Sequence, residues 1–311
     1  MRNYSKKLSS FLFCLITTIS IFSQSLNNTL YKDFVFEKVT KTNNQSYSTN
    51  IPAGAKEKAY RFDFYQPQND TSHHRPLVIW MHGGGFKLGS KKARGIPKWS
   101  KTFAQHGYTC AAINYRKSKK KPLKKFADLA AGCYEAIQDL DQAITYFKLN
   151  QQLLGIDTNR IILAGNSAGA MIAIQAVYSS PASLSKLSGD TSHSEYKYAN
   201  NFSTIAAIIN FWGAIFDTTM LHKASVPIVS VHGTTDGIVP YKQKDAPLYG
   251  SFYIQQQATA IGIPSDLKSY EGYAHELQKH FNPIFVSGAV RKRWLEAGKF
   301  ASDFLYRQLF K

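Results

Sequence analysis

Ser167 stands out first, because its neighbours suit nucleophilic chemistry. It lies in the pentapeptide GNSAG, residues 165–169. The apolar segment before it, residues 160–164, predicts a buried strand, and an Ala- and Ile-rich segment after it predicts a helix to about residue 178. A sharp turn at such a junction lifts a serine hydroxyl above a sheet, as in a nucleophile elbow. The alternative is a glycine-rich turn with no catalytic task.

A second glycine-rich segment, HGGGF at residues 82–86, follows another apolar run, PLVIWM at residues 76–81. Acyl transfer develops an oxyanion, which backbone N–H groups held in place stabilise. Glycines let a loop turn its N–H groups inward without an obstructing Cβ. A phosphate-binding loop is a rival interpretation, but its lysine and Ser/Thr are missing. A plain glycine turn is the other alternative.

In this order along the chain, HGGGF and GNSAG resemble the esterase and lipase branch of the α/β-hydrolases, including hormone-sensitive-lipase-like and carboxylesterase-type enzymes. They also resemble small secreted esterases that act on acetylated or feruloylated polysaccharides. The resemblance covers about residue 58 to the C-terminus. It implies an α/β-hydrolase fold and a triad in the chain order serine, acid, histidine.

The acid is expected after a late strand. Residues 227–231 are apolar, and the following HGTTDGIVP, residues 232–240, resembles the acid loop of the family, which places Asp236 as the acid. Asp217, which also follows a predicted strand, is the first alternative, and Asp245 is a weaker one. A turn residue before Gly237 is the non-catalytic interpretation of Asp236.

The histidine is expected after the last strand, predicted at residues 266–270. The segment YEGYAHE, residues 270–276, resembles the E-G-x-x-H loop of the family and places His275 in the triad, with His280 as the alternative. His82 and His232 begin glycine turns and are interpreted as structural. The remaining histidines lie in turns or polar stretches.

The resemblance implies the roles. Ser167 attacks an ester carbonyl, His275 transfers the proton and Asp236 orients the imidazole. The N–H groups of Gly84, Gly85 and Ala168 are expected to form the oxyanion hole. No metal or organic cofactor is expected, and the substrate is expected to be a short-acyl or carbohydrate-linked ester of acetyl or feruloyl type.

Two other functions stay open. One is a serine peptidase of the prolyl-oligopeptidase type, although the chain has no room for the propeller domain usual there. The other is a non-catalytic, polyanion-binding protein with a hydrolase-like fold. The presence of all three triad residue types favours the enzyme.

Strand and helix patterns alternate from about residue 76. The predicted strands are residues 58–65, 76–81, 109–115, 160–164, 204–212, 227–231 and 266–270, and the predicted helices include residues 126–149, 249–261 and 289–309. Such alternation is typical of an α/β fold whose mostly parallel sheet carries helices on both faces.

The N-terminus has the pattern of a signal peptide. Arg2, Lys6 and Lys7 precede an apolar stretch, residues 8–22, that is short for a membrane span. We expect a signal peptide over residues 1–23 and a single α/β-hydrolase domain over residues 24–311. The protein is therefore expected to be secreted or periplasmic, with no stable membrane insertion after cleavage.

The chain is strongly basic, with a formal net charge of +18. Its densest run, RKSKKKPLKK at residues 116–125, has no interleaved aromatic residues and no nucleic-acid motif, so a solvated loop is favoured and a nucleic-acid partner is not. An anionic polysaccharide is the weaker alternative for this loop.

Cys110 and Cys133 remain after signal cleavage. Export permits a disulfide between them, and two buried thiols are the favoured alternative. Residues 26–60 are polar, so a helical cap is not expected. The alcohol side of the substrate site is instead assigned to residues 179–203 and to the basic loop near Lys121.

Overall fold

The computed structural model describes residues 30–48, 51–93, 95–190, 201–243 and 247–311. The predicted signal peptide, residues 1–23, lies outside the described residues, as does the start of the predicted domain at residue 24. No helix among the described residues is long and apolar enough to cross a membrane.

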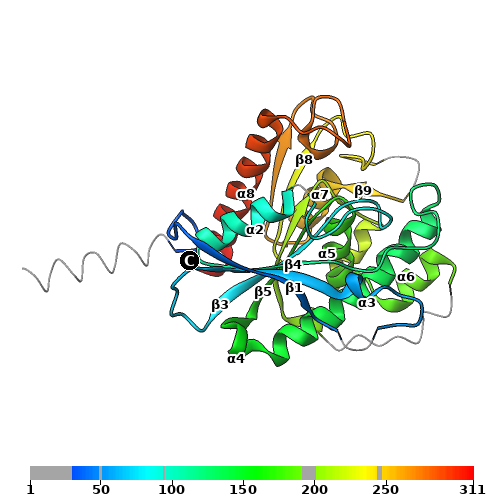
Figure 1. Ribbon diagram of the computed structural model, residues 1–311. Coiled ribbons are helices and arrows are strands. Elements are labelled where there is room, and N and C mark those ends of the chain that lie inside the picture. Colours follow the sequence, from blue (N-terminus) through cyan, green and yellow to red (C-terminus); the bar gives the residue numbers. More distant parts are fainter. Residues whose placement is uncertain (1–29, 49–50, 94, 191–200, 244–246) are drawn as a thin grey trace, which may run out of the picture.

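An eight-stranded sheet forms the centre of the described chain (Figure 1). In spatial order its strands are β1 (Val39–Ser46), β2 (Arg61–Pro67), β4 (Thr109–Ile113), β3 (Arg75–Met81), β5 (Ile156–Asn166), β6 (Ile205–Phe211), β8 (Ile228–Gly233) and β10 (Ser265–Tyr270). The pairs β1–β2 and β2–β4 are antiparallel, and every pair from β4 to β10 is parallel. The predicted mostly parallel sheet is confirmed.

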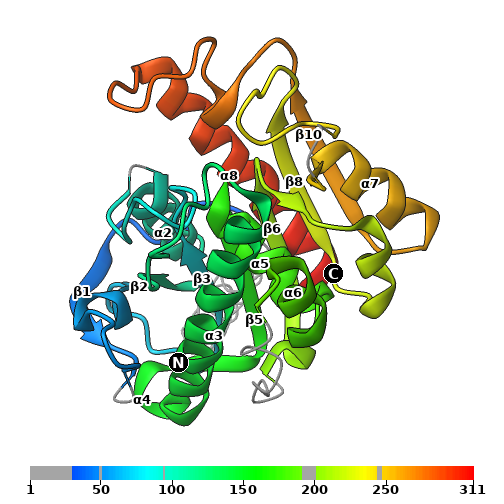
Figure 2. The same cartoon turned by 90° about the vertical axis from the view of Figure 1, so that its right-hand side faces the viewer.

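Helices cover both faces of this sheet (Figures 1 and 2). They are α2 (Gly95–Gln105), α3 (Phe126–Leu149), α4 (Gln151–Leu154), α5 (Ala168–Tyr178), α6 (Pro181–Ser188), α7 (Ser251–Ala260) and α8 (Gly288–Leu309). Buried side chains of α2 and α8 belong to the hydrophobic core on one face, and those of α3, α5 and α7 belong to the core on the other. A two-stranded ribbon, β7 (Ala214–Ile215) and β9 (Tyr249–Gly250), lies outside the main sheet.

Strand β3 shows why a continuous apolar run is needed here. Successive side chains of a strand point to opposite faces. Leu77, Ile79 and Met81 accordingly pack in the core with α3 and α5, whereas Val78 and Trp80 pack in the core with α2 and α8. Because helices cover both faces, both sets of positions must be apolar.

The cysteines follow the same rule. Cys110 of β4 lies in the core with α2 and α8, and Cys133 of α3 lies in the core on the other face. Both are free and buried. Because the sheet separates the two cysteines, they form no disulfide, and the favoured alternative of two buried thiols is confirmed.

Several elements lie outside the predicted set, and β1 and α2 show why. Strand β1 escapes a periodicity argument because it is an exposed edge strand with no alternation of apolar and polar residues. Helix α2 has an apolar stripe of Ile96, Trp99 and Phe103, but Pro97 interrupts the pattern in its first turn, where a helix tolerates proline.

Candidate active site

The candidate residues lie where four neighbouring or nearby parallel strands end. The glycine loop follows β3, Ser167 follows β5, Asp236 follows β8 and His275 follows β10. Carboxyl ends of parallel strands meet at one edge of a sheet, which is where open α/β sheets form their binding crevices. The fold therefore brings together residues far apart in the chain, such as Ser167 and His275, which are 108 positions apart.

Ser167 sits on a strained turn between β5 and α5. Its φ of 54° and ψ of −122° are backbone angles that non-glycine residues rarely adopt. The turn is possible because glycines stand two positions before and two positions after the serine. A Cβ on Gly169, for example, would lie 2.1 Å from the carbonyl oxygen of Met81 in β3. This close approach of helix to strand is the geometry expected of a nucleophile elbow.

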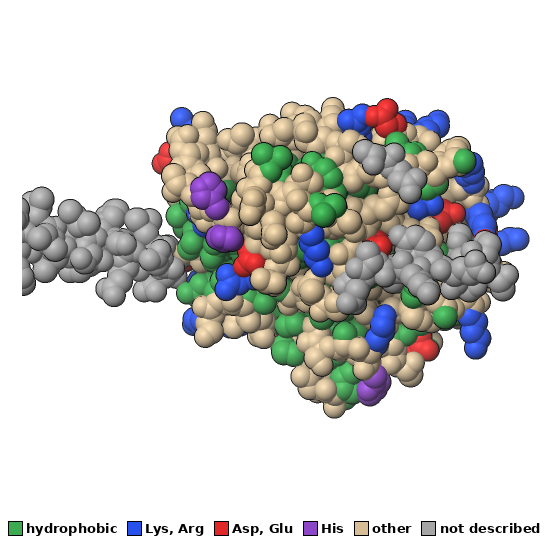
Figure 3. All heavy atoms as spheres, turned by 90° about the horizontal axis from the view of Figure 1, so that it is seen from below, with side chains coloured by type: hydrophobic (Ala, Val, Ile, Leu, Met, Phe, Trp, Pro, Cys, Tyr) green, Lys and Arg blue, Asp and Glu red, His purple; other side chains and the backbone are tan. Residues whose placement is uncertain are grey.

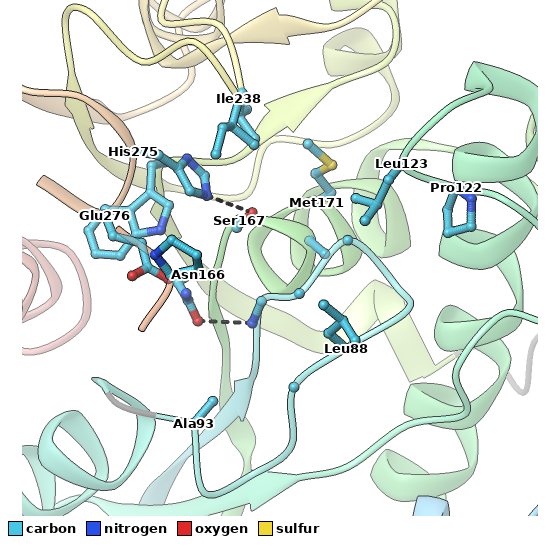
Figure 4. Close-up of a pocket in the computed structure, with 18 of the residues that line it drawn as sticks. Leu88, Ala93, Pro122, Leu123, Asn166, Ser167, Met171, Ile238, His275 and Glu276 are labelled. Carbon is cyan, nitrogen blue, oxygen red and sulfur yellow. Dashed lines mark hydrogen bonds between the residues drawn. The ribbon is translucent and has the colours of Figure 1, made fainter. Parts of the chain in front are cut away.

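The structure brings Ser167, His275 and Asp236 into one hydrogen-bonded row. Ser167 Oγ lies 3.1 Å from His275 Nε2 (Figure 4), and His275 Nδ1 lies 2.7 Å from Asp236 Oδ2. His275 begins the short 3-10 helix η5 (His275–Leu277). All three side chains are largely buried. A carboxylate accepts from Nδ1–H, which leaves Nε2 free to take a proton from the serine hydroxyl.

Asp236 is held as a carboxylate. Burial by itself raises the pKa of this carboxyl, but hydrogen bonds with His232 and His275 outweigh burial and hold the pKa well below its usual range. The backbone N–H groups of Ile238 and Val239 donate to Oδ1, at 2.9 and 3.0 Å. One oxygen is thus fixed by the loop backbone, and the other faces the imidazole.

His232 supports Asp236 from behind, a role that the sequence-based interpretation missed. Its Nε2 lies 3.1 Å from the carbonyl oxygen of Val239 and 3.3 Å from Asp236 Oδ2. Its Nδ1 lies 2.8 Å from Ser251 Oγ, which in turn is 3.1 Å from Asn210 Nδ2. The sequence analysis interpreted His232 as a structural residue of a glycine turn. The only sequence signal for its contact with Asp236 was the short spacing between the two residues.

The glycine loop is tied directly to the turn that carries Ser167. The N–H of Gly83 donates to Asn166 Oδ1 at 3.1 Å, a contact drawn in Figure 4. The N–H groups of Gly84, Gly85 and Ala168 make no hydrogen bond with another described residue. Three backbone donors beside Ser167 are thereby left for a ligand. The sequence analysis did not single out Asn166, which ties the glycine loop to this turn.

A cavity of about 730 Å³ opens above Ser167, and we call it the serine cavity. Leu88, Leu123, Met171 and Ile238 give it largely apolar walls (Figure 4). Such a cavity, with a few polar groups converging at one point, is typical of a small-molecule site.

The alternative acid and base candidates are not in this row. Asp217 caps a short helix, with its carboxylate accepting from the N–H of Thr219 at 2.9 Å. His280 is exposed, and Asp245 lies outside the described residues. Among the described residues, no three His, Cys, Asp or Glu side chains are grouped so that they could hold a metal ion.

The two segments expected on the alcohol side of the site differ in where the structure places them. Residues 179–190 do not line the serine cavity, because helix α6 within them packs against α3. Residues 191–200 lie outside the described residues. The end of the basic loop does line the cavity, through Pro122, Leu123, Lys124 and Lys125.

Comparison with known proteins agrees with this architecture. Gut esterase 1 of Caenorhabditis elegans is 30% identical over 95 residues, which are 30% of this chain and 17% of that protein. Fumonisin B1 esterase of Sphingopyxis macrogoltabida is 28% identical over 124 residues, 38% of this chain and 22% of that protein. The chain thus spans about a fifth of the length of these two curated relatives.

Among solved structures, Thermogutta terrifontis esterase 2 phosphorylated by paraoxon matches 88% of this chain and 96% of its own, with a TM-score of 0.59 and 20% identity. This match shows a shared fold. The BD-FAE family model matches residues 62–222, just over half of the chain. The chain therefore belongs to the BD-FAE family and has the α/β-hydrolase fold.

Proposed function

We propose that the protein is an exported serine hydrolase of carboxylic esters that works through an acyl-enzyme. The observation that carries the proposal is the hydrogen-bonded row of Ser167, His275 and Asp236 at the base of an apolar cavity. The names of the relatives, two of which are esterases, support the same reaction class.

In the proposed reaction His275 Nε2 accepts the proton of Ser167 as Oγ attacks the ester carbonyl. The N–H groups of Gly84, Gly85 and Ala168 stabilise the oxyanion, and their lack of other partners means that they need not reorganise. His275 then returns the proton to the leaving alcohol. Water, activated by the same imidazole, releases the acid and restores the serine.

The proposed substrate is an ester with a short or aromatic acyl group, attached to a carbohydrate. The apolar walls and the modest volume of the serine cavity suit such an acyl group. The rim also carries the half-exposed Ile238 and the partly exposed Phe281, against which an aromatic acyl group could pack. Export is proposed from the predicted signal peptide.

Replacing the nucleophile tests the reaction. Ser167→Ala should lower kcat for 4-nitrophenyl acetate by about 10⁴- to 10⁶-fold, because the attacking oxygen is lost. Paraoxon should inactivate the wild type and add one phosphoryl group at Ser167, detected by mass spectrometry of peptides. The matched control is Ser72→Ala, because Ser72 is exposed and does not line the serine cavity.

Turnover retained in Ser167→Ala would refute the proposal. So would cleavage of 4-nitroanilides of proline peptides at a higher kcat/KM than that of the esters, since a peptidase would then be the better description.

A further inference from the structure

A second cavity, of about 760 Å³, lies beside the serine cavity, and we call it the basic cavity. Its walls come from residues 52–59, from residues 114–120 after β4, and from the loop after β3. Gly89 and Ser90 of that loop line both cavities. The two cavities therefore adjoin at this loop.

The basic cavity carries an excess of positive charge. Six Lys and Arg side chains line it, against one carboxylate, that of Glu135. Asp139 neutralises Arg116 through a contact of 2.6 Å, and Asp190 lies 3.2 Å from Lys120.

The other four cations are Lys56, Lys58, Lys117 and Lys119, and none of them forms an ion pair with a described carboxylate. Lys and Arg side chains also gather along the right-hand edge of the face in Figure 3. Their charge is therefore available to an anionic ligand.

The segment that carries Lys117 and Lys119 is held in place. Lys87 Nζ donates to the carbonyl oxygens of Ser118, Lys119 and Lys120, at 2.9, 3.3 and 3.1 Å. The Lys119 ammonium lies close above Gly54, where a Cβ would meet it at 3.3 Å. Charges fixed in advance bind an anion at a lower entropic cost than charges on a freely moving loop.

His82 adds a hydrogen-bond acceptor to the same cavity. It is fully buried, lines the basic cavity, and has its Nδ1 2.7 Å from the carbonyl oxygen of Gly83. A carbonyl oxygen only accepts, so Nδ1 carries the proton and Nε2 is the acceptor in neutral His82. Nε2 is buried and has no partner among the described residues. Burial lowers the pKa of His82 to about 4, so the ring is neutral near pH 7.

From this combination we infer that the basic cavity binds an acidic sugar unit, one that bears a carboxylate or sulfate group, of the ester's carbohydrate portion. The charged group pairs with the lysines that line the cavity. A neutral sugar would leave the lysines unpaired. The inference rests on the proposed function and names its substrate class.

Binding is tested without turnover, in Ser167→Ala, by calorimetry. The probes are a trigalacturonate, a sulfated trisaccharide of similar size, a neutral xylotriose, inorganic phosphate and a short oligodeoxynucleotide. We expect at least one charged trisaccharide to bind more than tenfold tighter than xylotriose, and the tighter of the two identifies the anionic group. Adding Lys117→Gln and Lys119→Gln should weaken that binding about five- to tenfold.

Lys101→Gln with Lys292→Gln is the matched control, because both lysines are exposed and line neither cavity. An equal loss of binding in this control, equal binding of xylotriose, or equally tight binding of phosphate or the oligonucleotide would each overturn the inference.

Kinetics separate this inference from the proposed function. In otherwise wild-type protein, Lys117→Gln with Lys119→Gln should raise KM for an acetylated acidic oligosaccharide about five- to tenfold and leave kcat/KM for 4-nitrophenyl acetate within twofold. An unchanged KM for the acidic ester, with turnover intact, would sink the inference alone. Turnover that survives Ser167→Ala would refute the proposed function alone, since the binding measurement needs no turnover.

Discussion

The serine cavity and the basic cavity are nearly equal in volume and share part of one loop, yet they differ in the charges that line them. Three lysines and one glutamate line the serine cavity around Ser167, whereas six Lys and Arg side chains and one glutamate line the basic cavity. Lysines line the basic cavity, and its buried acceptor belongs to His82, next to the glycines that face Ser167. The difference indicates a division of labour, in which one cavity carries out the reaction and the other selects the substrate.

The shared loop depends on a buried ion pair. Lys91 Nζ contacts Asp63 Oδ1 and lies 2.8 Å from Asn44 Oδ1, and the Lys91 backbone N–H donates to Asn114 at 2.7 Å. Asp63 belongs to β2 and is fully buried. The loop that separates the two cavities is therefore anchored to the antiparallel side of the sheet.

The largest expected effect is on catalysis in the serine cavity and leaves binding in the basic cavity unchanged. Asp236→Asn keeps an oxygen for the N–H groups of Ile238 and Val239 but turns an amide toward His275 Nδ1, which forces the wrong imidazole tautomer. We expect kcat for 4-nitrophenyl acetate to fall by about 10⁴-fold at pH 7. The Kd of the charged trisaccharide, measured by calorimetry, should stay within twofold. A Kd that rises by the same factor by which kcat falls would contradict the division of labour.

The next largest effect should damage both cavities together. Asp63→Ala leaves the Lys91 ammonium buried without a counter-charge, which costs about 3–5 kcal/mol in the free energy of unfolding. Urea denaturation measures the loss, and both esterase activity and trisaccharide binding should decline. The double variant Asp63→Leu with Lys91→Met is the control, because replacing both partners by apolar groups should recover most of the stability. No recovery would argue against burial of an unpaired charge as the cause.

The smallest effect concerns pH and is specific to the basic cavity. Because burial lowers the pKa of His82 to about 4, the unfolded chain binds a proton more readily than the native state below pH 6.5. The stabilisation from neutral His82 is therefore present above pH 6.5 and is lost as the pH falls to about 4. The loss is about 3 kcal/mol.

Urea denaturation across that pH range should show a shallower decline for His82→Asn, which keeps a donor for the Gly83 carbonyl. His106 is also buried, and burial lowers its pKa to about 4 as well, but it lines neither cavity. The pH dependence of His106→Gln is therefore compared with that of His82→Asn. An unchanged pH dependence in His82→Asn would show that His82 is not the group responsible.

The sequence predicted the sheet and the residues at its edge well, because both depend on local patterns. Apolar runs such as residues 76–81 identify strands that are covered on both faces, and segments after such strands carry Ser167 and Asp236. His275 follows the polar edge strand β10 and was found by its resemblance to the E-G-x-x-H loop. Elements without such patterns were missed. Strand β1 is polar at an exposed edge. Residues 179–203 were expected at the site because they are polar and long for a connection, whereas α6 within them packs against α3.

Sequence alone determined which residues can do chemistry and the fold class that carries them, because strand periodicity and glycine spacing are written in neighbouring positions. Only the tertiary structure decided what those residues contact. It set Ser167 Oγ 3.1 Å from His275 Nε2 and placed His232 behind Asp236. It also left His82 Nε2 without a partner among the described residues, in the wall of a cavity lined by lysines. The reason is physical: distances and unpaired atoms depend on how segments far apart in the chain pack, and no local pattern records that packing.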